Sequence, residues 1–368
     1  MKKRIFATIA CFLVTFLLVF GCSNPSGGNE EVGLTGLASG LDSNDEEEQA
    51  TSDSDLDLDS EGEDQEMPIV LPPVAEFLSA RFVSGTEIEF EFSSPVTVLS
   101  LSFEPSVEVD SVEEGSTVRV SLEEEAAPAM QLMVEIIAED EWENTINVEV
   151  PLISKNSRVP ELQINELRTE YSKPNAEYIE FKIITDGNLG ALRVFAAGYY
   201  KNPMVYQFSP VEVIAGEYVV LHMRTLDDEC VDEYGENLDE SGGADSCPTA
   251  RDFWIPGTSK LLHKTDAVYV LDQDDNVLDA VMLSVVPDPS WGKTYFTEAA
   301  EFLFNKGAWA SPSGKICSPA DAVDSSKITP TRSIARDEDA ENTKTKADWY
   351  VTVTSGTTPG TLNNTKRL

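Results

Sequence analysis

Histidine is nearly missing from this sequence, which has only His222 and His263 among its 368 residues. A nucleophile–histidine–acid triad needs a histidine base beside an activated serine or cysteine. Neither histidine is accompanied by the Gly-x-Ser-x-Gly turn that presents such a serine, and no Gly-rich phosphate loop occurs. We therefore expect a non-enzymatic protein without a cofactor, whose two histidines lie on a sheet face and in a loop.

Positive charge is scarce as well, since 26 Lys and Arg face 66 Asp and Glu and the net charge is −40. Nucleic-acid affinity comes mainly from Lys and Arg that displace counterions, so no direct nucleic-acid partner is expected. Carboxylates are so abundant that close pairs of the glycosidase kind arise by chance and carry little information. A carboxylate-dependent hydrolase, or an accessory module of an extracellular hydrolase, is therefore kept only as the alternative function.

The sequence also lacks an apolar run long enough to cross a membrane, which takes about 20 residues. Three basic residues at positions 2–4 precede an uncharged stretch over residues 5–20, which ends in Gly21 and Cys22. This order of charged, apolar and small residues is typical of an export signal. We predict that residues 1–21 form a signal peptide that is removed.

The end of this segment, LVFGC over residues 18–22, resembles the bacterial lipobox, whose cysteine receives a lipid. It departs from the usual pattern because Val19 and Phe20 stand where a leucine and a small residue are common. The resemblance implies a lipid on Cys22, and two or three acyl chains hold a protein stably on a membrane. Ser23 follows in place of the aspartate of inner-membrane lipoproteins, which favours the outer membrane or cell surface.

Residues 22–67 are predicted to form a disordered acidic tether. From residue 23 to residue 67 the chain has fifteen acidic residues and no Lys or Arg. So little apolar surface cannot offset the entropy of ordering the backbone, and the charges repel one another. The alternating aspartates of residues 53–59 could also bind calcium, but the glycine and the distal glutamate of an EF-hand loop are missing.

Few cysteines remain after the signal peptide and Cys22, and no Cys-x-x-Cys pair or Cys/His cluster offers a zinc site. An exported protein is in an oxidising compartment. Cys230 and Cys247 enclose a polar stretch and are predicted to form a disulfide, which leaves Cys317 as the odd cysteine.

From residue 68 to residue 155 apolar and polar residues alternate, which is the period-two pattern of half-buried strands. Seven short strands are predicted in this region, an arrangement that suggests an Ig-like β-sandwich. The region resembles the small Ig-like repeats of bacterial surface proteins, which implies a spacing or recognition role. The predicted strands are 77–83, 87–92, 96–101, 107–109, 117–122, 131–137 and 145–150.

A second module is predicted over residues 161–368, after a polar link. Its segments resemble the lamin-tail domain, which implies a second Ig-like β-sandwich and a role in interaction. The predicted fold class is thus all-β, with two Ig-like sandwiches. The segments that carry the resemblance, in order, are 162–167 (LQINEL), 177–181 (EYIEF), 210–221, 266–281, 290–293 (SWGK), 333–336 (SIAR), 348–351 (DWYV) and 358–363 (TPGTLN).

Two insertions depart from the family pattern, at residues 226–256 and 311–330. Long loops on a rigid sandwich are common places both for function and for neutral drift. The first insertion is rich in carboxylates, which could bind a ligand or calcium or form a solvated acidic loop. The candidate residues in this loop are Asp227, Asp228, Asp232, Glu233, Glu236 and Asp239.

The predicted function is that of a lipid-anchored protein of the cell envelope that acts as a non-catalytic binding or structural module. Its partners would be the membrane, through Cys22, and a protein or polymer that the sequence does not identify. Aromatic residues of the second module form either a recognition patch or part of the core. These aromatic residues are Tyr199, Tyr200, Tyr206, Phe253, Trp254 and Trp309.

Overall fold

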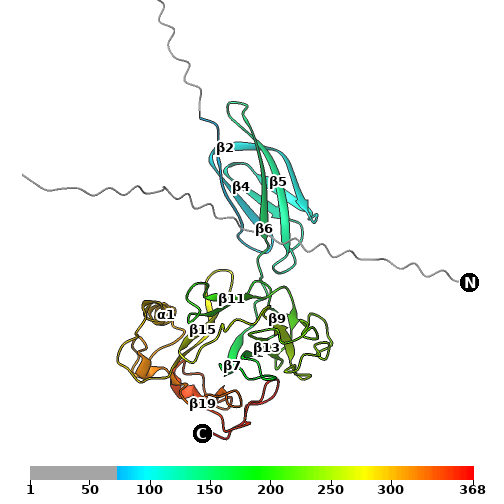
Figure 1. Cartoon of the computed structure of the whole chain (residues 1–368). Helices are drawn as coiled ribbons and strands as arrows, with labels where there is room; N and C mark the ends of the chain where they lie inside the picture. Colours follow the sequence, from blue (N-terminus) through cyan, green and yellow to red (C-terminus); the bar gives the residue numbers. More distant parts are fainter. Residues whose placement is uncertain (1–72) are drawn as a thin grey trace, which may run out of the picture. The chain divides into compact units, whose positions relative to one another are not determined.

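The computed structural model describes residues 73–368, which fold almost entirely into β-strands (Figure 1). The predicted all-β class is therefore confirmed. The predictions for residues 1–67, namely the signal peptide, the lipid on Cys22 and the tether, lie outside the described residues. No helix among the described residues is both long and apolar enough to span a membrane.

The first module, up to residue 153, is one antiparallel sheet with the strand order β3-β4-β2-β5-β6, in which β1 also pairs with β2. Its apolar side chains alternate along each strand, so Ile88, Phe90, Val118 and Val120 are completely buried. The strands are β1 Phe77–Phe82, β2 Glu87–Glu104, β3 Val109–Glu113, β4 Gly115–Leu122, β5 Gln131–Asp140 and β6 Thr145–Ile153.

Two of the seven predicted strands are joined in the structure, so six strands are present in this module and the prediction of seven is wrong. Residues 87–92 and 96–101 both belong to β2. The strand pairs with β4 over residues 87–91 and with β5 from Val96 onward. Pro95 has no N–H to donate to a ladder, and the change of partner occurs beside it.

The second module has two main sheets, and its core lies between them. One has the strand order β14-β13-β8-β7-β18-β19 and the other β11-β10-β15-β16-β17. The first sheet contains β7 Leu162–Arg168, β8 Tyr178–Ile183, β13 Tyr218–His222, β14 Arg251–Trp254, β18 Ile334–Arg336 and β19 Trp349–Val351. The second contains β10 Arg193–Ala196, β11 Met204–Gln207, β15 Asp266–Leu271, β16 Val277–Ser284 and β17 Val323–Asp324. A separate two-stranded sheet consists of β9 Gly187–Asn188 and β12 Glu212–Val213.

Each predicted insertion contains a strand of one of the two sheets and is therefore not a loop along its whole length. Residues 226–256 include β14, which lies parallel to β13, and residues 311–330 include β17, which lies parallel to β16. Each insertion therefore adds an edge strand to one of the two sheets. The simple loop interpretation of these segments is wrong.

One helix, α1 Thr294–Asn305, was not predicted. Its buried residues are Phe296, Ala299, Ala300 and Leu303. Their spacing of three, one and three residues is the pattern of an amphipathic helix. Two short 3-10 helices, η1 Pro319–Asp321 and η2 Lys346–Asp348, lie farther along the chain.

Candidate functional site

The acidic insertion covers the free edge of β14 with carboxylates. Asp232 Oδ1 accepts the backbone N–H of Trp254 at 2.7 Å, and Glu233 Oε2 accepts that of Asp252 at 2.8 Å. These oxygens take the place of a neighbouring strand, so the edge cannot pair with another chain. Burial raises the pKa of both carboxyl groups.

The six carboxylates predicted as a possible calcium loop do not converge. Glu233 Oε1 accepts two further backbone N–H groups, and Asp227 Oδ1 accepts that of Glu229. Asp228, Glu236 and Asp239 are exposed. Within residues 73–368 no group of three or more His, Cys, Asp or Glu side chains could hold a metal ion. The inner carboxylates are bound to backbone amides, and calcium binding by this loop stays a prediction.

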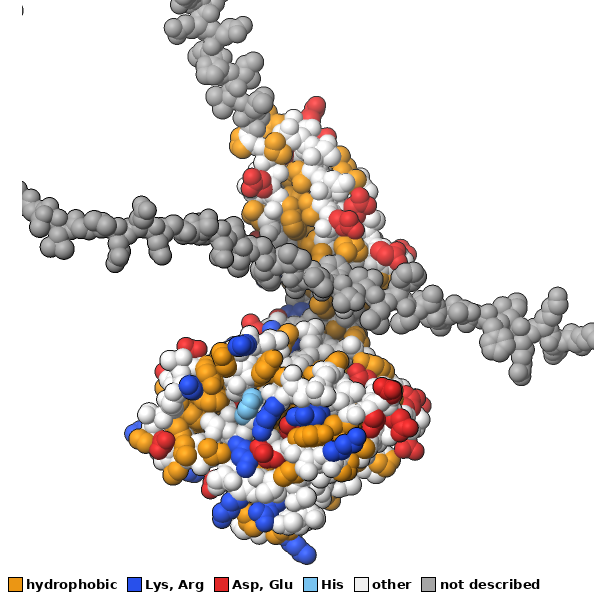
Figure 2. All heavy atoms as spheres, in the orientation of Figure 1, with side chains coloured by type: hydrophobic (Ala, Val, Ile, Leu, Met, Phe, Trp, Pro, Cys, Tyr) orange, Lys and Arg blue, Asp and Glu red, His pale blue; other side chains and the backbone are white. Residues whose placement is uncertain are grey.

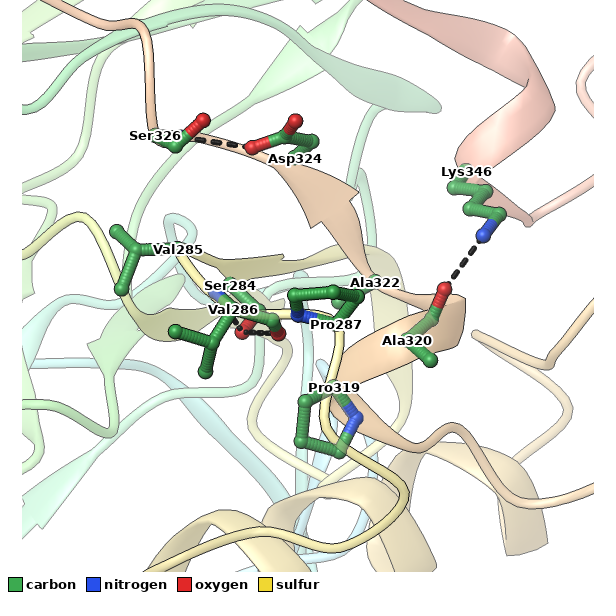
Figure 3. A pocket seen from close by; sticks show the side chains of 10 residues that line it. All are labelled: Ser284, Val285, Val286, Pro287, Pro319, Ala320, Ala322, Asp324, Ser326 and Lys346. Atoms are coloured by element: carbon green, nitrogen blue, oxygen red, sulfur yellow. Dashed lines mark hydrogen bonds between the residues drawn. The ribbon is translucent and has the colours of Figure 1, made fainter.

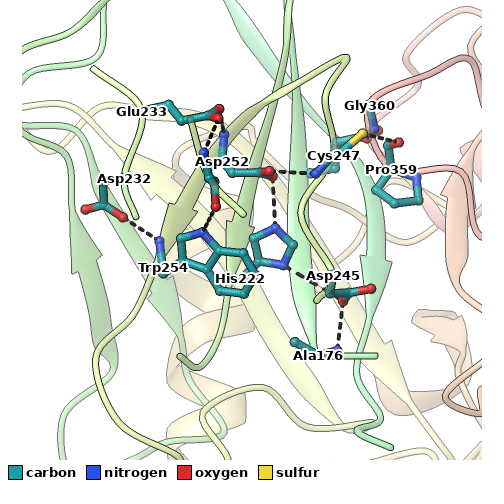
Figure 4. Close-up of polar contacts among 12 residues, drawn as sticks. Ala176, His222, Asp232, Glu233, Asp245, Cys247, Asp252, Trp254, Pro359 and Gly360 are labelled. Atoms are coloured by element: carbon teal, nitrogen blue, oxygen red, sulfur yellow. Dashed lines mark hydrogen bonds and ion pairs between the residues drawn. The ribbon is translucent and has the colours of Figure 1, made fainter. Parts of the chain in front are cut away.

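His222 lies at the end of β13 and is completely buried (Figure 4). Its Nε2 is 2.9 Å from Asp252 Oδ1, and its ring stacks on that of Trp254 with centroids 3.8 Å apart. Asp252 Oδ2 also accepts the N–H of Cys247 at 2.6 Å. On the other side of the ring, Nδ1 is 4.0 Å from Asp245 Oδ2. The imidazole thus joins β13 to the insertion and does not face solvent.

The predicted disulfide between Cys230 and Cys247 is not formed, because the two thiols have separate partners. Cys247 Sγ donates to the carbonyl of Pro359 at 3.0 Å, whereas Cys230 Sγ donates to Asp227 Oδ1 at 3.3 Å. Cys317 is buried, and all three thiols are free. Burial raises the pKa of Cys230 and Cys247 and favours their neutral form.

Residues 358–363, which we call the strap, are held on β7 and β8 by two buried glutamates. The backbone N–H of Thr358 donates to Glu166 Oε2 at 3.0 Å, and that of Gly360 donates to Glu180 Oε2 at 2.5 Å. Both glutamates are completely buried. The glutamates and the strap all belong to segments that carry the lamin-tail resemblance, and here they have a structural role.

Asn363 fixes the far end of the strap. Its Nδ2 donates to the carbonyl of Asn165 at 3.1 Å and to that of Arg336 at 2.9 Å. Its backbone N–H donates to Glu338 Oε1 at 2.7 Å. One asparagine therefore connects the strap to both β7 and β18.

The two strap glutamates differ from ordinary surface carboxylates. Burial raises the pKa of Glu166, although Ser333 and Tyr178 donate hydrogen bonds to it. Burial and the nearby charge of Glu166 raise the pKa of Glu180 well above its usual range. The folded chain therefore holds a proton in this pair at a pH where the unfolded chain releases it.

This raised pKa predicts a pH-dependent stability. Below the ordinary glutamate value of 4.5 the proton is bound in both states, and above it only the folded state keeps the proton. The free energy of unfolding should then fall as pH rises, by about 1.4 kcal/mol per pH unit while only the folded state is protonated. Glu180→Gln should remove the contribution of Glu180 to this slope and replace it by a constant offset from the changed hydrogen bonds.

The measurement is denaturant unfolding of the parent chain and Glu180→Gln between about pH 4.5 and about pH 8. Glu301→Gln is the control, because Glu301 is exposed on α1. The parent should lose stability relative to Glu180→Gln as pH rises. A difference that does not change with pH would contradict the buried, protonated pair.

A buried ion pair connects the two sheets of the second module. Asp279 on β16 pairs with Arg336 on β18, and these side chains are 5% and 3% exposed. Asp279 Oδ2 accepts the N–H of Ile164, and Arg336 Nε donates to the carbonyl of the same residue at 2.8 Å. Each charge therefore has both an ionic and a backbone partner, as buried charges require.

The predicted aromatic patch is only partly at the surface. Phe253, Trp254 and Trp309 are buried, so the patch interpretation is wrong for them. Tyr200 is 59% exposed and stacks on Tyr295, with ring centroids 5.4 Å apart.

His263 follows the loop prediction. It lies outside the strands, and its side chain is 38% exposed. The backbone N–H of His263 donates to Asp266 Oδ2 at 2.9 Å.

Comparison with known proteins gives a family match for the second module. The family model TP_1001_2nd, described as "protein second domain", matches residues 160–351, which is more than half of the chain. A protein of Treponema pallidum (strain Nichols), named "Uncharacterized protein", is 26% identical over 210 residues. The match covers 55% of this chain and 53% of that protein, so the chain spans about half the length of the curated relative it matches.

The matched region begins just before β7 and ends at the last residue of β19, so it contains both main sheets of the second module. The lamin-tail resemblance stays a prediction. The chain belongs to the family described as TP_1001_2nd, protein second domain.

Proposed function

We propose that this chain is a lipid-anchored protein of the cell envelope whose second module binds a protein or polymer without catalysis. The observation that carries the proposal is that the polar side chains of the segments conspicuous in the sequence are buried in this module. Glu166, Glu180, His222 and Asp279 are buried and bonded to neighbouring elements. These side chains stabilise the fold, so recognition would fall to the exposed side chains of the second module.

The surface of the second module is chemically mixed. Figure 2 shows Lys and Arg side chains gathered on its visible face, and Asp and Glu side chains gathered at one side. Several large apolar side chains are exposed as well, among them Tyr200, Ile214 and Val286. A rigid scaffold with charged and apolar surface features has the composition of a binding surface.

The hydrolase alternative has weaker support. Glycosidase chemistry needs two carboxyl groups on either side of a bond that substrate can bring between them. Glu166 and Glu180 lie opposite each other on β7 and β8, but the strap covers both. A substrate would have to displace the strap to reach them.

Site-specific photo-crosslinking from the whole chain tests the binding role. A photoreactive amino acid at Tyr200 of the second module is compared with one at Leu99 of the first, because both positions are more than half exposed. Adducts with envelope proteins or polymers should form from position 200, if the second module carries recognition. Adducts formed only from position 99 would contradict this assignment.

The anchor is tested at Cys22. Cys22→Ser should lose labelling by a radioactive fatty acid and leave unprocessed or soluble protein, because the acyl chains supply most of the membrane affinity. Cys230→Ser is the control, since that thiol lies within a folded loop. Cys22→Ser that still partitions into detergent as the parent does would refute the lipid anchor.

A further inference from the structure

The strap of residues 358–363 lies directly on the thiol of Cys247 (Figure 4). Cys247 Sγ donates to the carbonyl of Pro359 at 3.0 Å, and a Cβ built at Gly360 would lie 2.2 Å from the same sulfur. Cys247 is 8% exposed. The hollow of about 490 Å³ beyond the end of β16 is lined by residues other than Cys247 and the strap (Figure 3). That hollow does not lead to the thiol, whereas movement of the strap would uncover it.

Carboxylates hold the strap on the sheet. The strap belongs to no strand, and three of its backbone N–H groups donate to glutamate side chains instead. The donors are Thr358, Gly360 and Asn363, and their acceptors are Glu166, Glu180 and Glu338 in that order. Leu362, the largest apolar side chain of the strap, is 70% exposed. The strap can therefore leave the sheet without exposing much apolar surface of its own, so its opening costs less free energy than unfolding of the module.

Glu180 lies beside another carboxyl group under the strap. Glu166 is directly opposite it on β7, and both glutamates are completely buried. The cations of this region pair with other residues, Arg168 with Asp245 and Lys182 with Glu338. The other titratable and charged groups around Glu180 are Arg168, Tyr178, Lys182, Tyr218, Cys247 and Glu338. Two negative charges on the opposed glutamates would therefore meet both burial and mutual repulsion.

We propose that the strap is a lid, which opens when the Glu166–Glu180 pair loses its proton and uncovers Cys247 while the two sheets stay folded. Ionisation leaves two buried negative charges on neighbouring strands, and opening lets water reach both. Cys247 then becomes a site of thiol modification whose accessibility depends on pH. This inference goes beyond the proposed function and does not depend on the lipid anchor.

The direction of the pH effect follows from the two states of the lid. In the closed state burial and the charge of Glu166 raise the pKa of Glu180 well above its usual range, whereas water in the open state restores the ordinary value of 4.5. Below this value the proton is bound in both states, and the closed state keeps its full stability. Above it, the open population grows by up to about tenfold per pH unit, until the closed pair is ionised too.

Maleimide labelling of the purified whole chain tests the lid. The thiolate adds to the carbon–carbon double bond of the reagent, and the resulting carbanion takes a proton from water, so a thioether forms without any oxidant. The maleimide is kept dilute, so that the strap opens and closes many times before the thiol reacts. Mass spectrometry of the peptides gives a rate for each cysteine. At about pH 7 Cys247 should react at least about tenfold faster than Cys317, which is 2% exposed in the main core of the module.

Low concentrations of urea separate opening of the strap from unfolding. The Cys247 rate should stay nearly constant, because opening exposes little surface, whereas the Cys317 rate should rise with urea. Equal rates for the two thiols with the same dependence on urea would show that the strap does not open alone, and would overturn the proposal.

Glu180→Gln tests whether the proton controls the lid. The same thiol is compared in both proteins, so its own ionisation cancels from the ratio of the two rates. The Cys247 rate of the parent divided by that of Glu180→Gln should rise by up to about tenfold per pH unit between about pH 5 and about pH 8. A ratio that does not change with pH would rule out the glutamate pair as the trigger.

Asn363→Ala provides a second variant, which leaves both glutamates in place and removes the side-chain bonds to the carbonyls of Asn165 and Arg336. It should raise the Cys247 rate about tenfold at constant pH, and the faster rate should remain insensitive to low urea. Asn202→Ala is the control, because Asn202 is exposed, and it should not change the rate. An Asn363→Ala chain that is labelled as slowly as this control would contradict the lid.

Discussion

Replacing Arg336 by methionine is expected to lower the free energy of unfolding by about 3–5 kcal/mol, the usual cost of leaving a buried charge without its partner. Arg336 is 3% exposed and neutralises Asp279, which is 5% exposed and lies on the other sheet. Burial raises the pKa of Asp279 even with the guanidinium present. Without Arg336 the carboxyl group must take up a proton or remain as an uncompensated charge between the sheets.

Two variants make this prediction specific to the pair. Lys260→Met removes an exposed partner of Glu170 and should change stability by less than about 1 kcal/mol. Asp279→Leu combined with Arg336→Met should recover much of the loss, because neither charge then remains buried. Denaturant titration of the four proteins gives the comparison. An Arg336→Met chain as stable as Lys260→Met would show that the ion pair does not hold the sheets together.

Gly360→Ala is expected to destabilise the second module by roughly 2–5 kcal/mol, with a contribution of about 1–2 from the left-handed backbone and about 1–3 from overpacking. Gly360 has a φ of +76°, and a Cβ built there would lie 2.2 Å from Cys247 Sγ. The methyl group fits only if the strap or the Cys247 side chain moves, and movement of the strap would break its hydrogen bond to Glu180.

Gly257→Ala separates the two contributions. Gly257 has a φ of +94°, but a Cβ there would meet nothing within 4 Å. This variant should therefore show the backbone cost alone, and Gly360→Ala should exceed it by about 1–3 kcal/mol. The double variant Cys247→Ala with Gly360→Ala should regain part of that excess. Equal destabilisation by the two glycine replacements would indicate that the strap is not packed against Cys247.

The strands could be predicted from the sequence because their signal is local. The alternation of residues 131–137 predicted a strand, and the structure has β5 there, with Leu132, Val134 and Ile136 inside. The position of His222 in a strand followed from its apolar neighbours in the same way. Helix α1 carries an equally local signal, the spacing of Phe296, Ala299, Ala300 and Leu303, and could have been found by its period.

The roles of the acidic residues could not be predicted, because they depend on groups far along the chain. In the sequence Asp232 and Glu233 are typical of a solvated loop. In the structure they accept backbone N–H groups of β14, which lies about twenty residues later in the chain. The motif glutamates show the same limit: the sequence identified Glu166 and Glu180 as part of a pattern but not the strap that covers them.

The strap also determines when the second module can complete its fold. Thr358 bonds to Glu166 across 192 residues of chain, and Gly360 bonds to Glu180 across 180. During synthesis, β7 and β8 therefore emerge long before the groups that satisfy their buried carboxylates, and such unsatisfied groups oppose a stable early hairpin. Contacts of such long range also slow folding. The second module therefore reaches its full stability only after the chain has been made through Asn363.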